Sequence, residues 1–503
     1  MKKKVSPPIL FFFLFASLLY YFSIKDSKKI CYGTQLKVLT INSFNLTPDI
    51  PEINYIGSSF ADMTMTRLSQ IKSINLIERV HLERAKKKLG IKPGDLITKE
   101  LAVKIGDLLD ADLVVIGTIQ TLTKDSFKVG SQILDLRKED KKEEIFTSEP
   151  VNIKDGIEGI EKSENIESIN RLQGEVAQFI TKSIPVTLTQ EQVTQVNKDY
   201  TRSGPAYVCY AKGRELYVNY TETDNDKAIE LFKEAINKDP NYALACAGLA
   251  DAYAQKGGYY NACDRDYIEE AIKMGEKSRE LDPDLPEAYK ALGIAYTYKG
   301  RPDMNEILLK QGEDNLKKAL TYNDHYLEAH LNLGKIYLWL GKEKYSDAQD
   351  KFEFVIEKDK FNPVSHYYMG YFYGICKNYD DALKEYETAI KLEKDLNHRE
   401  GKISLDSYIN IACCYIEDNE LDKAKEALKE AEKINPDYSY CHYSRSLLYA
   451  KEEKYEEALE EMNIYLTMDK KAMNEPINKE RKEHIDEFMK KIKEELENEK
   501  KGE

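Results

Sequence analysis

Few residues in this 503-residue chain occur in types and spacings that could support chemistry. His325 and His330 are close in sequence, but five residues apart their rings diverge on a helix, so we expect no metal site there. Cys413 and Cys414 would point to different faces of one helix, which favours packing over redox chemistry. The chain has no phosphate-binding glycine loop, no G-x-S-x-G and no H-E-x-x-H. The sequence therefore predicts a protein that is not an enzyme and has no metal or cofactor.

Composition narrows the class of partner. The net charge is −14, with 88 acidic residues against 74 Lys and Arg. Nucleic acids and anionic lipid surfaces repel such a protein, so we expect no nucleic-acid partner. Hydrophobic residues make up 42% of the chain, enough for substantial cores, and the length suggests two or three domains. What remains as a functional candidate is a surface that binds protein.

A recurring pattern from about residue 205 to 470 would position that surface. Each copy begins with an apolar or aromatic residue, continues with a Leu-Gly-like pair and a Tyr, and often ends in Asp-Pro or Asn-Pro. The small residue lets two helices approach closely, an Ala four residues before an aromatic lies on the same helix face, and Pro stops the helix. The copies open at Cys209 (a looser match), Cys246, Tyr289, His330, His366, Tyr408 and His442.

These residues resemble the tetratricopeptide repeat, a helix pair of about 34 residues. One such pair cannot bury its apolar face alone, so the resemblance implies a stacked solenoid over residues 205–475 with about seven copies. The segments 256–266 and 299–310 add length between the paired helices, and we expect them to protrude as loops.

In such a solenoid the first helices line a concave groove, and aromatic side chains there are typical anchors for a partner. The repeat register places candidate partner-binding residues in that groove, although several of them could instead pack between helices. They are Lys290, Glu328, Leu331, Lys335, Trp339, Tyr367, Tyr371, Tyr440 and Tyr443. The paired Lys, Arg and Asn of repeats that clamp a terminal carboxylate are not found, so we do not expect an acidic tail as ligand.

The N-terminus is typical of an export signal. Lys2, Lys3 and Lys4 precede an apolar run over residues 9–24, and no clean cleavage site precedes Cys31. We favour a signal anchor over a cleaved peptide, with a buried core helix as a further alternative. The lysines would stay on the cytoplasmic side of the cytoplasmic membrane, and the bulk of the chain would lie on its outer side. A cleaved signal would instead make the protein periplasmic or secreted.

Residues 35–186 read as an α/β layer. We expect strands near residues 36–41, 74–77 and 113–119 and a hairpin that includes Phe127 and Ile133 and continues from Ile145. We expect helices near residues 60–71, 82–89, 101–109 and 166–180. Together they would form a mixed sheet with packed helices.

Three segments of this region resemble a known extracytoplasmic domain. Residues 38–44 (VLTINSF), residues 75–79 (NLIER) followed by Leu82, and above all residues 102–118 (AVKIGDLLDADLVVIGT) are similar to the CsgG, FlgO and TolB N-terminal type. The resemblance implies an envelope protein that could oligomerise or bind a small ligand through this domain. A curli-type pore is not expected, because no paired strands alternate strictly for 9–11 residues.

The predicted organisation is therefore a signal anchor or signal peptide at 1–34, the α/β domain at 35–186, a linker at 187–204, the repeats at 205–475 and a charged capping helix at 476–503. We expect a non-enzymatic envelope scaffold that holds a partner protein in the repeat groove and contacts the cytoplasmic membrane through its N-terminus. The alternative is a sensing or secretion accessory protein whose α/β domain oligomerises or binds a small ligand.

Overall fold

The computed structural model groups residues 36–503 into one compact unit. The residues that it describes are 36–47, 54–69, 71, 74–92, 95–123, 126–137, 143–152, 166–184, 187–260, 264–301, 304–396, 401–472 and 479–502. Within these ranges, every helix is too short or too polar to cross a bilayer. The predicted anchor over residues 9–24 lies outside the described residues.

A mixed sheet forms from the N-terminal strands, as predicted. Its order is β2-β1-β3-β4-β5, and β6 also pairs with β4. The β1 strand runs parallel to β2 and β3, while β3–β4, β4–β5 and β4–β6 are antiparallel. The strands are β1 (Leu36–Thr47), β2 (Ile74–Leu76), β3 (Leu113–Thr123), β4 (Ser126–Asp135), β5 (Glu143–Thr147) and β6 (Val151–Asn152).

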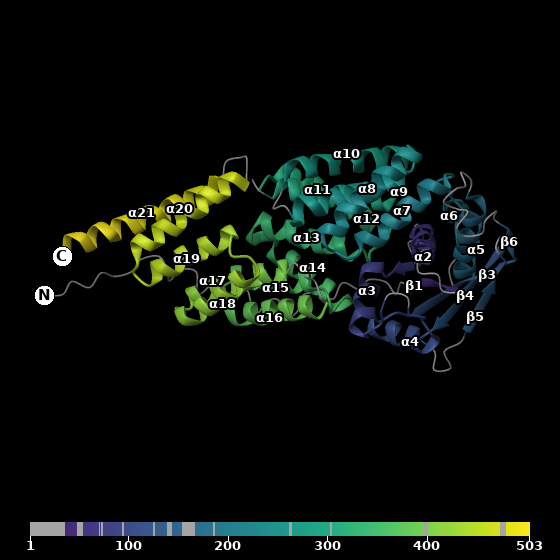
Figure 1. Cartoon of the computed structure of the whole chain (residues 1–503), viewed down its shortest axis with the longest axis horizontal. Coiled ribbons are helices and arrows are strands. Elements are labelled where there is room, and N and C mark those ends of the chain that lie inside the picture. The colour runs from purple at the N-terminus through teal and green to yellow at the C-terminus, as the bar shows by residue number, and fades with distance from the viewer. Residues whose placement is uncertain are drawn as a thin grey trace. The chain divides into compact units, whose positions relative to one another are not determined.

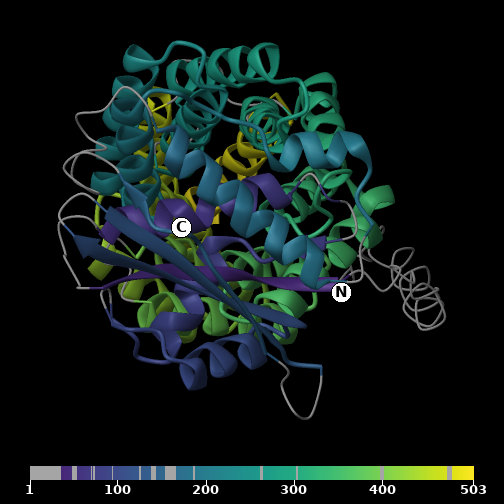
Figure 2. The same ribbon diagram turned by 90° about the vertical axis from the view of Figure 1, so that its right-hand side faces the viewer.

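Helices cover both faces of this sheet (Figure 1) because successive side chains of β3 point to opposite sides. Val114 and Ile116 join one core cluster with residues of α3 (Arg79–Lys88) and α4 (Lys99–Leu108). Leu113, Val115 and Ile119 face α2 (Asn54–Leu68) and α5 (Glu167–Ser183) in another cluster. Figure 2 shows helix ribbons on the two sides of the purple and blue strands.

The rest of the chain is a mostly helical solenoid of stacked pairs, joined to the sheet through α6 (Gln190–Val196). The first helices are α7 (Gly204–Tyr217), α9 (Ala243–Gln255), α11 (Pro286–Gly300), α13 (Leu327–Leu340), α15 (Pro363–Ile375), α17 (Lys402–Glu417) and α19 (Ser439–Lys451). The second helices are α8 (Glu222–Lys238), α10 (Arg265–Leu281), α12 (Glu306–Leu320), α14 (Tyr345–Lys358), α16 (Tyr379–Asp395), α18 (Leu421–Ile434) and α20 (Tyr455–Ala472).

The small residue of each repeat has the predicted role of close approach. A methyl group built on Gly334 would lie 2.5 Å from the ring of Phe352, and one on Gly293 would lie 2.5 Å from Leu316. At the end of the chain, Ile485 of α21 (Lys479–Gly502) packs with Met462 and Tyr465 of α20.

The sheet and the first repeats share one hydrophobic core. Phe60 and Met63 of α2 belong to the same buried cluster as Tyr207 of α7 and Tyr242 at the start of α9. Packing therefore does not separate a distinct α/β domain from the solenoid. The domain boundaries proposed above stay predictions.

Candidate partner-binding groove

The groove-lining helices follow one another directly along the solenoid. Contacts join α7 to α9, α9 to α11, α11 to α13, α13 to α15, α15 to α17 and α17 to α19. A continuous face of first helices is therefore available, as expected for such repeats. The contacts described next show that this face is not uniformly open.

Elements of the chain's own N-terminal part lie against the first repeats. Thr66 Oγ1 of α2 donates a hydrogen bond to Glu287 Oε1 at the start of α11 (3.3 Å). Arg79 of α3 pairs with Asp62 of α2 (Nη1–Oδ2, 3.1 Å) and also with Glu215 of α7. The α2 and α3 helices thus lie against the early part of the groove.

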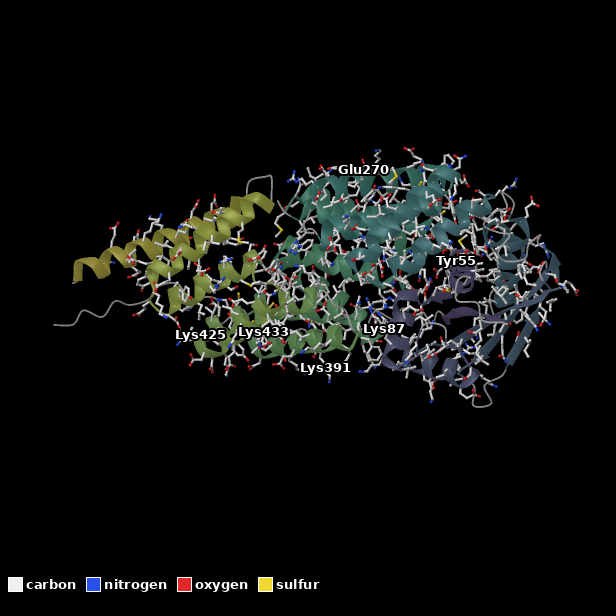
Figure 3. The ribbon with its side chains drawn as sticks, viewed as in Figure 1. Tyr55, Lys87, Glu270, Lys391, Lys425 and Lys433 are labelled. Carbon is white, nitrogen blue, oxygen red and sulfur yellow. The ribbon has the colours of Figure 1, made fainter. Side chains whose placement is uncertain are left out.

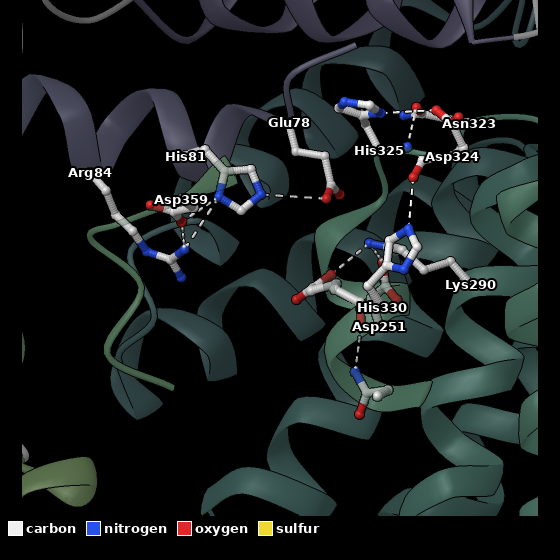
Figure 4. Close-up of polar contacts among 12 residues, drawn as sticks. Glu78, His81, Arg84, Asp251, Lys290, Asn323, Asp324, His325, His330 and Asp359 are labelled. Carbon is white, nitrogen blue, oxygen red and sulfur yellow. Dashed lines mark hydrogen bonds and ion pairs between the residues drawn. The ribbon is translucent and has the colours of Figure 1, made fainter. Parts of the chain in front are cut away.

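A second contact ties α3 to a later repeat. Arg84 Nη1 donates a hydrogen bond to Asp359 Oδ2 at 2.6 Å, and His81 Nδ1 lies 2.6 Å from the same oxygen (Figure 4). Asp359 caps α14, and its other oxygen accepts a bond from the backbone N–H of Phe361 (3.1 Å). We call His81, Arg84 and Asp359 the α3 clasp.

Charge pairing inside the clasp is strong because its members are nearly inaccessible. The side chain of Asp359 is 0% exposed and that of His81 is 3% exposed. Burial acts to raise the pKa of Asp359, but Arg84 and His81 outweigh it and hold that pKa well below its usual range. Burial likewise acts to lower the pKa of His81, but the Asp359 carboxylate raises it to about 9. The clasp is therefore a charged contact at neutral pH.

Two of the candidate groove residues, Lys290 and Glu328, are brought together. Lys290 Nζ lies 2.9 Å from Glu328 Oε2 and 3.2 Å from Asp251 Oδ2, and the hydroxyl of Tyr220 donates to Glu328. Lys290 is 5% exposed. Burial acts to raise the pKa of Glu328, but Lys290 and the Tyr220 hydroxyl lower it overall, whereas burial raises the pKa of Asp251 to about 6. Both candidates are engaged within the chain.

Leu331, Lys335 and Trp339 occupy the next stretch of α13. Leu331 and Lys335 are buried, and Trp339 is half-buried with the Arg301 guanidinium 5.4 Å from its ring. Lys335 Nζ lies 5.4 Å from the ring centroid of Tyr298 and 4.7 Å from that of Tyr368. Burial, with repulsion from Arg301, lowers the pKa of Lys335 to about 7. These three side chains pack between helices, the alternative that the repeat register left open.

The four tyrosine candidates lie farther along the solenoid and are half-buried. Tyr367 and Tyr371 stack with ring centroids 6.5 Å apart, and Asn410 Nδ2 donates to the Tyr367 hydroxyl (3.3 Å). Tyr440 and Tyr443 form a second cluster around Tyr465, with centroid distances of 5.9 and 5.2 Å. These aromatic clusters belong to α15 and to α19–α20. The α3 helix also reaches this part of the solenoid, because Lys88 Nζ lies 3.1 Å from Asp395 Oδ2 at the end of α16.

Sequence reasoning missed the residues that hold the N-terminal part against the repeats. These are Thr66, Arg79, His81, Arg84, Glu287 and Asp359. The only available signal was the Asp or Asn at the end of several second helices, which marks a turn and does not identify a partner. Among the described residues, no cluster of three or more His, Cys, Asp or Glu could hold a metal ion.

Comparison with known proteins supports the repeat assignment. Residues 405–438 match the family model for the tetratricopeptide repeat. The chain carries tetratricopeptide repeats. The matched segment runs from the first turn of α17 through α18 to the turn before α19, so it spans nearly all of one helix pair of the solenoid.

Curated relatives match only parts of the chain. Anaphase-promoting complex subunit 3 of Schizosaccharomyces pombe is 27% identical over 217 residues, which cover 43% of this chain and 30% of that protein. The barley (Hordeum vulgare) protein named "Probable UDP-N-acetylglucosamine--peptide N-acetylglucosaminyltransferase SPINDLY" is 30% identical over 116 residues, 22% of this chain and 11% of its own. The chain thus spans less than a third of the length of either relative.

A solved tetratricopeptide repeat protein from Thermus thermophilus superposes with a TM-score of 0.33 and 22% identity. It covers 40% of this chain and 99% of its own.

Proposed function

We propose that the protein is a non-enzymatic scaffold that holds a partner protein on the later part of its repeat groove, along α15, α17 and α19. The observation that carries the proposal is the division of the groove. The polar contacts of α2 and α3 go to α7 and α11 and to the C-terminal ends of α14 and α16, whereas the half-buried Tyr367, Tyr371, Tyr440 and Tyr443 lie on the first helices α15 and α19. Half-buried tyrosines on a rigid face supply contact area at a small entropic cost.

Affinity capture with matched variants tests this proposal. The full chain, the double variant Tyr367→Ala/Tyr371→Ala and the control Tyr296→Ala would each be used to capture proteins from membranes. Tyr296 is also a half-buried tyrosine of a first helix, but it interacts with Glu276 of the outer helix α10. We expect the double variant alone to lose partners identified by mass spectrometry, with melting temperatures similar for all three proteins.

The opposite pattern would contradict the proposal. If the double variant keeps its captured proteins and its melting temperature falls by several degrees, the two tyrosines serve only the core. Because the capture compares three forms of one chain, nonspecific binders are expected in all three samples and do not affect the comparison.

We further propose that the sheet with α2 to α5 is a domain of the CsgG, FlgO and TolB N-terminal type and that the protein acts in the cell envelope. The mixed sheet and the motif of residues 102–118, which forms α4 and the start of β3, support this proposal. Deleting residues 1–34 should release the protein from membranes washed at alkaline pH. Equal membrane retention of the two forms would contradict anchoring by this segment.

The second candidate function is that of a sensing protein with a small-ligand site in its N-terminal part. A small cavity between α2, β2 and the first repeats favours it, since several polar groups converge there.

A further inference from the structure

A cavity of about 80 Å³ lies where the N-terminal elements meet the first repeats. Its walls come from α2, β2 and the start of α3 on one side and from α7, α9 and α11 on the other. A volume of this size accommodates a few water molecules or one small ion with its partners. It is too small for a drug-sized ligand.

The lining of this cavity carries an excess of negative charge. Four carboxylates line it: Asp62, Glu78, Asp251 and Glu287. Three basic groups line it: Arg79, Arg214 and Lys290. Two of the bases are also shared with carboxylates behind the lining, because Arg79 pairs with Glu215 and Lys290 pairs with Glu328. One lining carboxylate is shared in the same way, because Glu78 Oε2 lies 3.6 Å from His81 Nε2 behind the lining.

Three buried carboxylate oxygens on its walls have no hydrogen-bond partner within the described residues. They are Glu78 Oε2, which lies 3.6 Å from His81 Nε2, and Asp251 Oδ1 and Glu287 Oε2; Arg214 Nε on the same walls also lacks an acceptor among these residues. Asp251 is 4% exposed, and its other oxygen lies 3.2 Å from Lys290 Nζ. Glu287 uses its other oxygen to accept from Thr66. Burial of an unpaired carboxylate oxygen is costly, so such atoms call for a cation, a proton or water.

Burial raises the pKa of Glu287 to about 7 and that of Asp251 to about 6. Such shifts are expected where the surrounding bases do not compensate the carboxylates fully. Figure 4 shows Asp251 and Lys290 on the repeat side, with Glu78 projecting from the N-terminal side.

We propose that this cavity binds one small monovalent cation, of the size of ammonium or potassium, between Asp251 and Glu287. Carboxylate oxygens, with Asn323 and Tyr326 as neutral neighbours, are suitable ligands for such an ion. The site is independent of the partner groove proposed above.

Thermal unfolding of the full chain in three chloride salts at equal ionic strength tests the proposal. Potassium and ammonium fit the cavity, whereas tetramethylammonium is too large and serves as the reference. We expect a melting temperature about 1–2 °C higher in at least one of the two small-cation salts. If only potassium raises the melting temperature, the site prefers a metal ion. If only ammonium raises it, the site prefers a cation that donates N–H hydrogen bonds.

Asp251→Asn and Glu287→Gln should each abolish the difference between the salts. Glu270→Gln is the matched control, because Glu270 lies on the exposed side of α10 (Figure 3) and should leave the difference unchanged. A rubidium soak provides a direct readout on the unmodified protein, with an anomalous peak expected in the cavity. Identical melting in all three salts together with no peak there would show that the cavity holds only water and protons, and would overturn the proposal.

Discussion

At the scale of single residues, the turn that ends α14 both caps its helix and binds α3. Asp359 caps its helix, as an Asp or Asn does at the end of other second helices. One of its carboxylate oxygens also forms ion pairs with His81 and Arg84 of α3. A buried carboxylate with two cationic partners is costly to leave half-paired. The clasp is thus a sensitive point of contact between the N-terminal part and the repeats.

We expect Asp359→Asn to lower the free energy of unfolding by about 3–5 kcal/mol, because it leaves two buried cationic groups without their anion. Urea denaturation followed by circular dichroism measures the loss. Glu430→Gln is the control, since it breaks the exposed Lys433–Glu430 pair on the surface of α18 (Figure 3), where less than about 1 kcal/mol is expected. Similar losses in the two variants would show that the clasp contributes no more than a surface pair.

The clasp also predicts a loss of stability at alkaline pH. The pKa of His81 is raised from 6.5 to about 9, so its stabilising effect is complete below about pH 6.5 and is lost as the pH rises through about 9. The contribution is on the order of 3 kcal/mol. Unfolding measured between pH 6 and 10 should show a decline that is absent in His81→Gln. A parallel decline in both proteins would assign the pH dependence to other groups.

At the scale of elements, helix packing rather than helix propensity explains the repeat glycines. Gly370 and Gly374 both lie in α15, one turn apart, but a methyl group on Gly370 would come within 2.9 Å of the Tyr386 ring, whereas one on Gly374 would meet its hydroxyl at 3.7 Å. Substitutions at the two positions therefore distinguish the effect of close packing from the effect of backbone entropy within a single helix.

Replacing Gly370 with Ala should destabilise the protein by about 1–3 kcal/mol, because Tyr386 must shift within a packed core. The matched Gly374→Ala should be neutral or stabilising by up to about 1 kcal/mol, since Ala favours a helix. Thermal unfolding of both variants checks the contrast. If both lower stability equally, close packing against α16 is not the reason for Gly370.

The type of an element was predictable where it depends only on residues that are close in sequence. The apolar run of β3, the 3–4 spacing of α2 and the repeat signature all gave the correct type of element because strand and helix periodicity depends only on neighbours in sequence. The apolar face of α2 indicates burial but does not reveal that Phe60 and Met63 pack beside Tyr207 and Tyr242. That pairing depends on how two distant segments meet.

The same limit applies to the candidate site. Repeat register placed Lys290 and Glu328 on one face, and the structure brings them within 2.9 Å. Register could not show that Tyr220 and Asp251 would occupy the remaining positions around them, or that Lys335 would be enclosed by Tyr298 and Tyr368. Whether a groove residue is free for a partner depends on side chains from other repeats and from the N-terminal part.

At the scale of the whole described unit, hydrophobic contacts are unevenly distributed along the chain. One cluster runs from the sheet and α2 through the repeats as far as Phe372. The later repeats depend on smaller clusters, one around Tyr386 and Leu428 and others around Cys441 and Tyr465. Solenoid stability propagates between neighbours, so the two stretches are expected to open separately.

Native-state hydrogen exchange tests this division. Protection should be greater in α2 and α7–α13 than in α17–α19, because the former share the continuous core. Phe60→Ala removes a side chain that is 0% exposed and should cost about 3–5 kcal/mol, lowering protection in the first stretch only. Leu428→Ala, at a position that is 2% exposed, should cost about 2–5 kcal/mol and act on the second stretch only. Equal loss of protection throughout the chain in both variants would mean that the unit opens as a whole; the proposed groove would then open together with α2 and α3.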